Sequence, residues 1–262
     1  MEGLADKVAI VVGGSSGIGE ASARALGAAG AALILAGRDI NRGEAVADQL
    51  TATGVRCRFV PADVRAVEAI GSVVQTAVEM FGHVDILVNS AGHTRPVSFF
   101  DICEMDWEEL LGVNARAVLF AMQAAAAQMR ATGGGRIINI ASVGGLGYGR
   151  SSNVAYAAAK GAVIAMTKVA AFQLARYGIT VNAICPGYTD TPMYAAMLDE
   201  IAAVSSRDRE ALLREVVGRI PLRKVNRAAD VAAAVVFLAS AGGDQITGHT
   251  LVVDGGLMVG GL

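Results

Sequence analysis

Residues 7–26 read KVAIVVGGSSGIGEASARAL, and this stretch changes character in its middle. Its first half is a short, continuous run of apolar residues, which is typical of a parallel strand covered on both faces. Its second half has the pattern of a helix, and glycines lie at the junction. The stretch therefore predicts a buried strand, a tight turn and a helix, which together begin a βαβ unit.

The glycines at this junction suit the binding of phosphate. Glycine permits a tight turn and lets backbone N–H groups approach a pyrophosphate, while the helix N-terminus adds partial positive charge. Because the glycines follow a predicted strand and open a predicted helix, they favour a dinucleotide site over an ordinary glycine-rich turn. The predicted phosphate loop comprises Gly13, Ser15, Ser16, Gly17, Ile18 and Gly19.

The rest of the chain continues the alternation of strand and helix. Predicted strands span residues 7–13, 31–37, 56–63, 84–90, 135–142, 178–185 and 250–255, and helical patterns fill the gaps, for example 17–29, 41–53 and 66–81. The expected fold class is therefore α/β, a Rossmann-type doubly wound parallel sheet of about seven strands with helices on both faces.

No repeat or linker divides the sequence, so we expect a single domain over residues 1–262. The alternation breaks only at 188–222, where the chain leaves a predicted strand for helical sequence. Open α/β sheets bind ligands at the carboxyl ends of their strands, so we interpret this segment as a substrate lid. Its bulky residues predict a fairly apolar pocket: Tyr188, Met193, Tyr194, Met197 and Leu198.

Composition excludes several classes of protein. A hydrophobic content of 53% with 18% charged residues argues for a large core and against disorder. A net charge of −2 with scattered basic residues predicts no binding to nucleic acid or anionic lipid. The cysteines have no metal-ligand spacing and suggest buried free thiols, so we expect no metal site. With no apparent signal peptide or membrane span, we expect a soluble cytoplasmic protein.

The end of the second predicted strand, LILAGRD, bears on the choice of dinucleotide. A carboxylate there would bind the ribose 2′-hydroxyl and repel a 2′-phosphate. This chain has Gly37 and then Arg38, whose guanidinium suits a phosphate, and Ser15 and Ser16 could also donate to it. Asp39 follows and could reach the ribose if the turn is shifted. NADP is therefore favoured, and NAD stays possible.

One apolar segment, NVAYAAAKGAVIAM at residues 153–166, keeps two titratable side chains. Tyr156 and Lys160 are one helical turn apart and share a face. A nearby ammonium favours the phenolate, so we expect Lys160 to lower the pKa of Tyr156 and make it an acid/base group. An amphipathic helix with a core tyrosine and a snorkelling lysine is the alternative for the pair alone.

These motifs together resemble the short-chain dehydrogenase/reductase family over nearly the whole chain. The glycine pattern is matched, with Val12 in place of the usual threonine, and NSAG stands for the family's Asn-Asn-Ala-Gly, with Ser90 substituted. The resemblance implies that the catalytic residues are Asn114, Ser142, Tyr156 and Lys160. It adds as dinucleotide contacts Asp63, Val64, Asn89, Ala91, Gly92, Tyr156, Lys160, Pro186, Gly187, Thr189 and Thr191.

Roles follow from the same resemblance. Lys160 would also hold the nicotinamide ribose, Ser142 would orient the substrate oxygen, and Asn114 would anchor a water that relays protons. The predicted function is hydride transfer between a nicotinamide cofactor and a ketone or secondary alcohol, in a homotetramer. One alternative is a 3-oxoacyl-[acyl-carrier-protein] reductase, for which Arg130 and Arg176 could hold an acidic carrier. An alternative of another class is a non-catalytic dinucleotide-binding sensor or scaffold.

Overall fold

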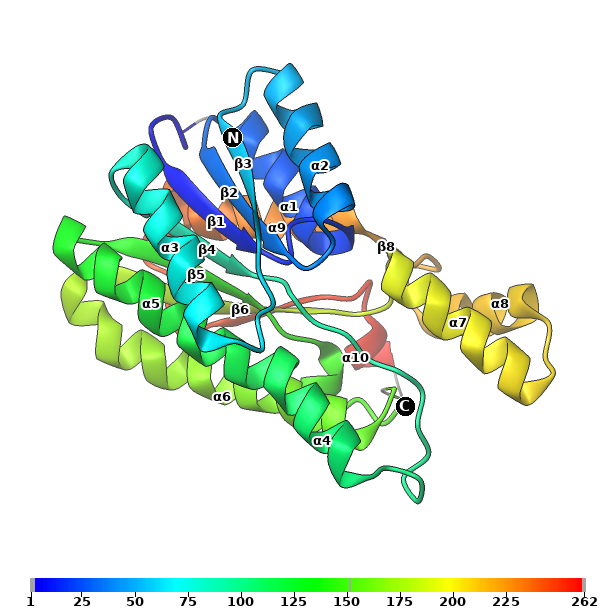
Figure 1. Cartoon of the computed structure of the whole chain (residues 1–262). Coiled ribbons are helices and arrows are strands. Elements are labelled where there is room, and N and C mark those ends of the chain that lie inside the picture. The colour runs from blue at the N-terminus through cyan, green and yellow to red at the C-terminus, as the bar shows by residue number, and fades with distance from the viewer. Residues whose placement is uncertain (1–2, 151, 261–262) are drawn as a thin grey trace.

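A seven-stranded parallel sheet forms the centre of the structure (Figure 1), a computed structural model that describes residues 3–150 and 152–260. The strands are β1 (Val8–Val12), β2 (Ala32–Gly37), β3 (Cys57–Pro61), β4 (Ile86–Asn89), β5 (Gly135–Ile140), β6 (Ile179–Pro186) and β9 (Thr250–Val253). They are ordered β3-β2-β1-β4-β5-β6-β9, so the predicted doubly wound sheet is confirmed. The order reverses between β1 and β4, which opens a crevice at the carboxyl ends of these strands.

Helices cover both faces of the sheet (Figure 1). One layer consists of α1 (Gly17–Ala28), α2 (Ile40–Ala52) and α9 (Ala228–Ala239). The other consists of α3 (Val67–Phe81), α4 (Glu104–Leu111), α5 (Ala117–Thr132) and α6 (Val154–Leu174). Each layer encloses its own apolar core with alternate side chains of the strands, as expected for strands buried on both faces.

Two helical stretches, Glu104–Thr132 and Val154–Tyr177, are long and apolar enough to pass a composition test for a membrane span. Both belong to the second helix layer and pack through buried residues against the sheet. This packing accounts for part of their apolar character, and each stretch also keeps exposed apolar side chains.

The segment that breaks the alternation forms an arm beside the sheet, as Figure 1 shows on the right. Its helices are α7 (Pro192–Ser205) and α8 (Arg209–Arg219). Two short strands that the sequence did not predict, β7 (Thr189–Asp190) and β8 (Asn226–Arg227), pair in parallel where the arm leaves and rejoins the body. The arm has a small apolar core of its own, which includes Val143 from the loop after β5 and Leu257 at the start of α10 (Leu257–Gly260).

A buried polar chain crosses the second helix layer. Asn89 Nδ2 donates to Asn139 Oδ1 over 2.9 Å, and Asn139 Nδ2 donates to Thr167 Oγ1 over 2.9 Å. Asn139 and Thr167 are fully buried, so these bonds offset the cost of removing their polar groups from water. The chain links β4 to β5 and β5 to α6 directly beneath the crevice.

The cysteines depart partly from expectation. All three are free thiols, but only Cys185 is buried, whereas Cys57 is half-buried and Cys103 is exposed. Cys103 precedes α4 as its N-cap and lies on the surface. The mixture of polar and apolar residues around it in the sequence does not reveal this exposure. No cluster of potential metal ligands occurs within residues 3–150 and 152–260.

Candidate active site

A cavity of about 940 Å³ lies at the carboxyl ends of the strands and extends from the loops after β1 and β2 to the arm. Its size suits one large ligand or two smaller ones side by side. Most residues that the sequence assigned to a site line it: Gly13, Ser15, Ser16, Gly17, Ile18, Arg38, Val64, Ala91, Gly92, Ser142, Tyr156, Lys160, Pro186, Gly187, Thr189 and Thr191. Segments far apart in sequence therefore meet in one cavity, as predicted.

The phosphate loop has the geometry that a dinucleotide requires. Gly13 has φ +85°, and a methyl group on it would lie 2.5 Å from the backbone nitrogen of Ala91. A methyl group on Gly19 would lie 2.1 Å from the carbonyl oxygen of Gly13, so only glycine lets helix α1 approach the turn this closely. Ser16 precedes α1 without capping it through its side chain, which leaves the first N–H groups of the helix free for an anion.

Basic side chains surround the loop after β2. Arg38, Asp39 and Arg42 all line the cavity. The Asp39 carboxylate is already engaged, because it accepts the Arg42 N–H over 3.0 Å as the cap of α2 and lies 3.2 Å from the Arg42 guanidinium. The Asp39 charge is thus balanced by Arg42, Arg38 lines the same cavity, and the preference for NADP over NAD stays a prediction.

Four predicted site residues do not line the cavity. Gly19 acts through packing against Gly13, and Asn114 lies behind the cavity wall. The Asp63 carboxylate pairs with Arg65 over 2.6 Å, and hydrogen bonding from Arg65 lowers the pKa of Asp63 to about 2. The Asn89 side chain is turned into the interior, where its Nδ2 donates to Asn139 Oδ1, and a contact of Asn89 with the dinucleotide stays a prediction.

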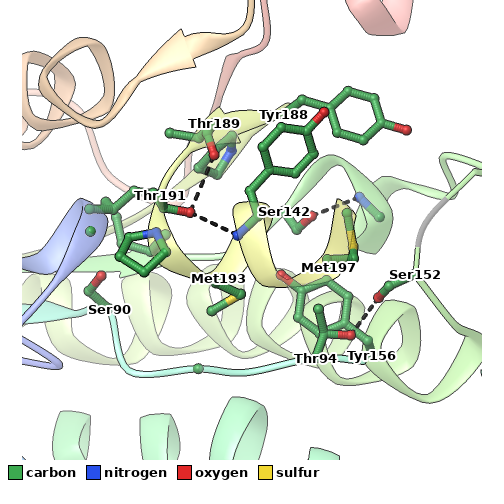
Figure 2. A pocket seen from close by; sticks show the side chains of 18 of the residues that line it. Ser90, Thr94, Ser142, Ser152, Tyr156, Tyr188, Thr189, Thr191, Met193 and Met197 are labelled. Atoms are coloured by element: carbon green, nitrogen blue, oxygen red, sulfur yellow. Dashed lines mark hydrogen bonds between the residues drawn. The ribbon is translucent and has the colours of Figure 1, made fainter. Parts of the chain in front are cut away.

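The catalytic candidates meet in the middle of the cavity. Asn153 caps α6 by accepting the Tyr156 N–H over 2.7 Å, which fixes the start of the helix that carries Tyr156 and Lys160. Ser142 follows β5, and its Oγ accepts the Gly144 N–H over 3.1 Å. Figure 2 shows Ser142 and Tyr156 around the same space, together with Met193 and Met197 of α7.

Burial decides the protonation of the tyrosine–lysine pair. It raises the pKa of Tyr156 to about 12, and the Ser142 hydroxyl acts in the opposite direction to a smaller extent. Burial also lowers the pKa of Lys160 to about 8. The prediction that Lys160 lowers the pKa of Tyr156 is therefore wrong here. The Lys160 ammonium donates to the Ile140 carbonyl over 2.9 Å and lies 5.7 Å from the centre of the phenol ring, so desolvation outweighs its attraction.

Asn114 has one unused polar atom that faces this pair. It lies in a π-helical turn, Gly112–Arg116, a feature often found at functional sites. Its Nδ2 donates to the carbonyls of His93 and Leu110, while its buried Oδ1 has no hydrogen-bond partner. A methyl group on Gly92 would lie 2.7 Å from that Oδ1 and 3.4 Å from Lys160 Nζ, so both polar atoms border one small space beside Gly92.

The far wall of the cavity comes largely from the arm. Tyr188, Met193 and Met197 lie there as the sequence suggested, and the Tyr188 ring packs edge-on against Tyr148 at 6.2 Å. Sequence reasoning missed further residues that line the cavity: Thr94, Tyr148, Arg150, Ser152, Arg207, Leu212, Glu215, Val216 and Arg219. The position of Thr94 and Tyr148 in loops after β4 and β5 was the signal that could have found them.

Two arginines considered for an acidic carrier lie elsewhere. Arg130 and Arg176 stack on Tyr177, at 4.9 Å and 4.8 Å from its ring centre. Arg130 lies in the last turn of α5, and Arg176 lies in the short turn after α6. Both are near the edge of the sheet where β5 and β6 begin, whereas the cavity lies where these strands end. Neither arginine lines the cavity, so neither supports a carrier at its entrance.

The chain is similar to known proteins over almost its full length. A family model for short chain dehydrogenases matches residues 7–202. The chain is 37% identical over 251 residues to the short-chain reductase protein NovJ of Streptomyces niveus, covering 96% of this chain and 94% of that protein. It is 35% identical over 253 residues to an acetoacetyl-CoA reductase of Acinetobacter sp. (strain RA3849), covering 96% and 97%.

Among solved structures, a variant of the actinorhodin polyketide ketoreductase with NADPH superposes with a TM-score of 0.91 at 32% sequence identity, and 98% of each chain is covered. The shared family is thus supported by sequence, by fold and by a site that contains Ser142, Tyr156 and Lys160. This chain belongs to the short-chain dehydrogenase/reductase family and is an NAD(P)-dependent oxidoreductase of CH–OH and C=O groups.

Proposed function

We propose that the protein is an NADPH-dependent ketone reductase in which Tyr156 donates the proton. The observation that carries this proposal is the burial of Tyr156 beside Ser142, in the cavity that also contains the phosphate loop. Because burial raises the pKa of Tyr156 to about 12, the phenol keeps its proton at physiological pH. A protonated phenol can donate to the alkoxide that develops on a carbonyl, which is the role that ketone reduction requires.

The other side chains position the reactants. The dinucleotide, when bound, supplies the hydride. Ser142 donates its hydroxyl hydrogen to the substrate oxygen and holds that oxygen beside the Tyr156 hydroxyl. Lys160 uses one ammonium hydrogen on Ile140, so two remain for the ribose hydroxyls of the dinucleotide and for a water.

Asn114 completes a route for protons. Its unpartnered Oδ1 and Lys160 Nζ border the same small space beside Gly92. A water there would accept from Lys160 and donate to Asn114, which satisfies both groups. Such a water would return a proton to Tyr156 through Lys160 and the ribose after each turnover.

Arg38 supports NADPH over NADH. Arg38 follows β2 and lines the cavity together with Arg42, while the Asp39 carboxylate is engaged with Arg42. A 2′-phosphate at this place would gain charge-assisted hydrogen bonds. We expect Arg38→Ala to lower kcat/KM for NADPH about tenfold and to leave NADH nearly unaffected. Tighter binding of NADH than of NADPH by the unaltered protein would reverse the assignment.

The arm favours a ketone with an apolar body. Met193, Met197 and Tyr188 line the same cavity as Ser142 and Tyr156 (Figure 2). The names of two similar proteins, an acetoacetyl-CoA reductase and a polyketide ketoreductase, also indicate reduction of keto groups. The carrier-protein alternative has lost its candidate docking residues, because Arg130 and Arg176 lie away from the cavity.

The decisive experiment compares Tyr156→Phe with a matched Tyr177→Phe control, using NADPH and a panel of ketones. We expect Tyr156→Phe to lower turnover about a thousandfold and to keep NADPH binding, while Tyr177→Phe, whose ring lies outside the cavity, stays near the unaltered protein. Comparable turnover in both variants would refute the role of Tyr156. If the unaltered protein binds NADPH but reduces no ketone, it is instead a non-catalytic sensor or scaffold.

We further propose that the protein forms a homotetramer in the cytoplasm. Apolar side chains of the second helix layer remain exposed in the single chain, namely Leu119 on α5 and Val169 and Phe172 on α6, and Phe172 is 87% exposed. A face of this kind commonly marks a subunit interface. Sedimentation of the unaltered protein and of Phe172→Glu tests this: a tetramer that dissociates in the variant supports the proposal, and a monomeric unaltered protein refutes it.

A further inference from the structure

Three arginines gather around one carboxylate at the arm end of the cavity. Arg150 lies in the loop between β5 and α6, Arg207 in the turn between α7 and α8, and Arg219 at the end of α8. With Glu215 of α8, all of them line the cavity. We call Arg150, Arg207 and Arg219 the arginine cluster.

The contacts within this group leave positive charge unbalanced. Arg207 Nη2 donates to Glu215 Oε2 over 2.8 Å, and Arg219 donates to the other oxygen, Glu215 Oε1. Arg150 has no hydrogen-bonded acid in the part of the chain that the structure describes, although its charge helps to lower the pKa of Glu215. Three guanidinium groups and one carboxylate therefore line this part of the cavity, and positive charge is in excess there.

Other ion pairs of the arm are balanced and lie elsewhere. Arg209 pairs with Asp199 over 2.6 Å, and Arg214 lies 3.7 Å from Asp208 and 3.6 Å from Glu210. None of these residues lines the cavity. These pairs keep their charges away from the cavity, whereas Arg150, Arg207 and Arg219 carry theirs on the side chains that a ligand can reach.

An apolar span separates the arginine cluster from the catalytic residues. Leu212 and Val216 share the cavity wall with Glu215 on α8, and both pack in the small core that includes Val143, the residue after Ser142. Tyr188 lies between the two ends of this span. Its ring packs edge-on against Tyr148, and the charge of Arg219 acts to lower the pKa of its hydroxyl. A ligand that reaches from Ser142 to the arginine cluster crosses this wall.

We propose that the arginine cluster binds an anionic group, a carboxylate or phosphate, at the far end of the substrate, so that the preferred substrates are ketones with an apolar spacer and a terminal anion. Guanidinium groups suit both anions, which they can bind in bidentate geometry. Glu215 holds two of the arginines in place and competes with the ligand for them. Exchange is easy because these pairs are partly exposed, with 41% of the Glu215 side chain accessible to solvent.

This inference rests on the proposed ketone reduction, and matched substrates test it. The probes are methyl ketones with a terminal carboxylate, in increasing chain length, their uncharged methyl esters, and the corresponding terminal phosphates. NADPH oxidation is followed with each. We expect one chain length at which kcat/KM for the acid exceeds that for its ester about tenfold or more, and the phosphate series reports which anion is preferred.

Variants then assign that preference to residues. Arg219→Met should raise KM for the best acid about tenfold, with a much smaller effect on kcat and on the ester. Glu215→Gln should act in the opposite direction and lower KM for the acid, because the competing carboxylate is gone. Arg214→Met, on the same helix but outside the cavity, should change neither value.

Thermal unfolding of each variant separates ligand binding from stability. If the arginine cluster only ties α7 to α8, both Arg219→Met and Glu215→Gln will lower stability and impair acid and ester equally, which overturns the inference. Reduction of the esters at least as well as the acids by the unaltered protein also overturns it, and leaves the proposed function intact. If no ketone of either series oxidises NADPH, the proposed function fails, and this inference fails with it.

Discussion

Replacing Lys160 by methionine tests how strongly burial acts on the catalytic pair. Lys160 is only 4% exposed, and its pKa falls from 10.5 to about 8 on folding. At pH values between these two pKa values, Lys160 is mostly protonated in the unfolded chain and mostly neutral in the folded protein. The free energy of unfolding therefore rises with pH in this window, and the cost of the buried ammonium is fully present below about pH 8.

The size of the effect follows from the two pKa values. Each pKa unit corresponds to about 1.4 kcal/mol, so the complete effect is about 3 kcal/mol. Between about pH 6.5 and about pH 9.5, which lies below the range where Tyr156 ionises, the linkage relation gives about 2 kcal/mol. Lys160→Met keeps most of the side-chain volume and removes the titrating group.

The assay is urea-induced unfolding of the unaltered protein, of Lys160→Met and of Lys168→Met at several pH values. Lys168 lies on the same helix but is exposed, so it serves as the matched control. We compare the free energy of unfolding of the unaltered protein with that of each variant. The difference from Lys160→Met should grow by about 2 kcal/mol from about pH 6.5 to about pH 9.5, and the difference from Lys168→Met should stay constant. Equal and flat pH profiles for the two comparisons would refute the assigned pKa of Lys160.

Two further substitutions test the scaffold of the site. Gly13→Ala should abolish NADPH binding and destabilise the protein by about 2 kcal/mol or more, because the new methyl group would lie 2.5 Å from backbone atoms at a φ of +85°. Gly54→Ala is its control, since Gly54 has φ +88° but no atom within 4 Å of the added group, and should cost only about 1 kcal/mol in thermal unfolding. Asn139→Ala should lower the free energy of unfolding by about 2 kcal/mol, because it removes the hydrogen bonds that Asn139 makes with the buried Asn89 and Thr167. Denaturant unfolding measures this, and a change below about 0.5 kcal/mol would contradict it.

The main sheet could be predicted from sequence because its strands are continuously apolar and alternate with helices. Strand β1, Val8–Val12, is fully buried, and the glycines after it are constrained by local geometry that the motif already encodes. Strands β7 and β8 escaped prediction because each has two residues and no periodicity to detect. Their pairing depends on where the arm ends, which only the folded chain defines.

The sequence predicted most of the residues that line the cavity, but it did not predict the direction in which the pKa of Tyr156 is shifted. The spacing of Tyr156 and Lys160 places both on one helix face, yet it does not reveal that the ammonium is drawn to the carbonyl of Ile140. Asn89 shows a related limit, since its place in the NSAG motif does not tell which way its side chain points. The arginine cluster was invisible because Arg150 lies far in sequence from Arg207 and Arg219 and meets them only in the folded protein.

The narrow connection of the arm has an evolutionary consequence. The arm leaves and rejoins the body through one pair of two-residue strands, and it carries its own small core. Insertions, deletions or substitutions within α7 and α8 can therefore change what the enzyme accepts, provided that Thr191 and the packing against Val143 are kept. A scaffold with such a joint can diversify in specificity while its chemistry is inherited unchanged.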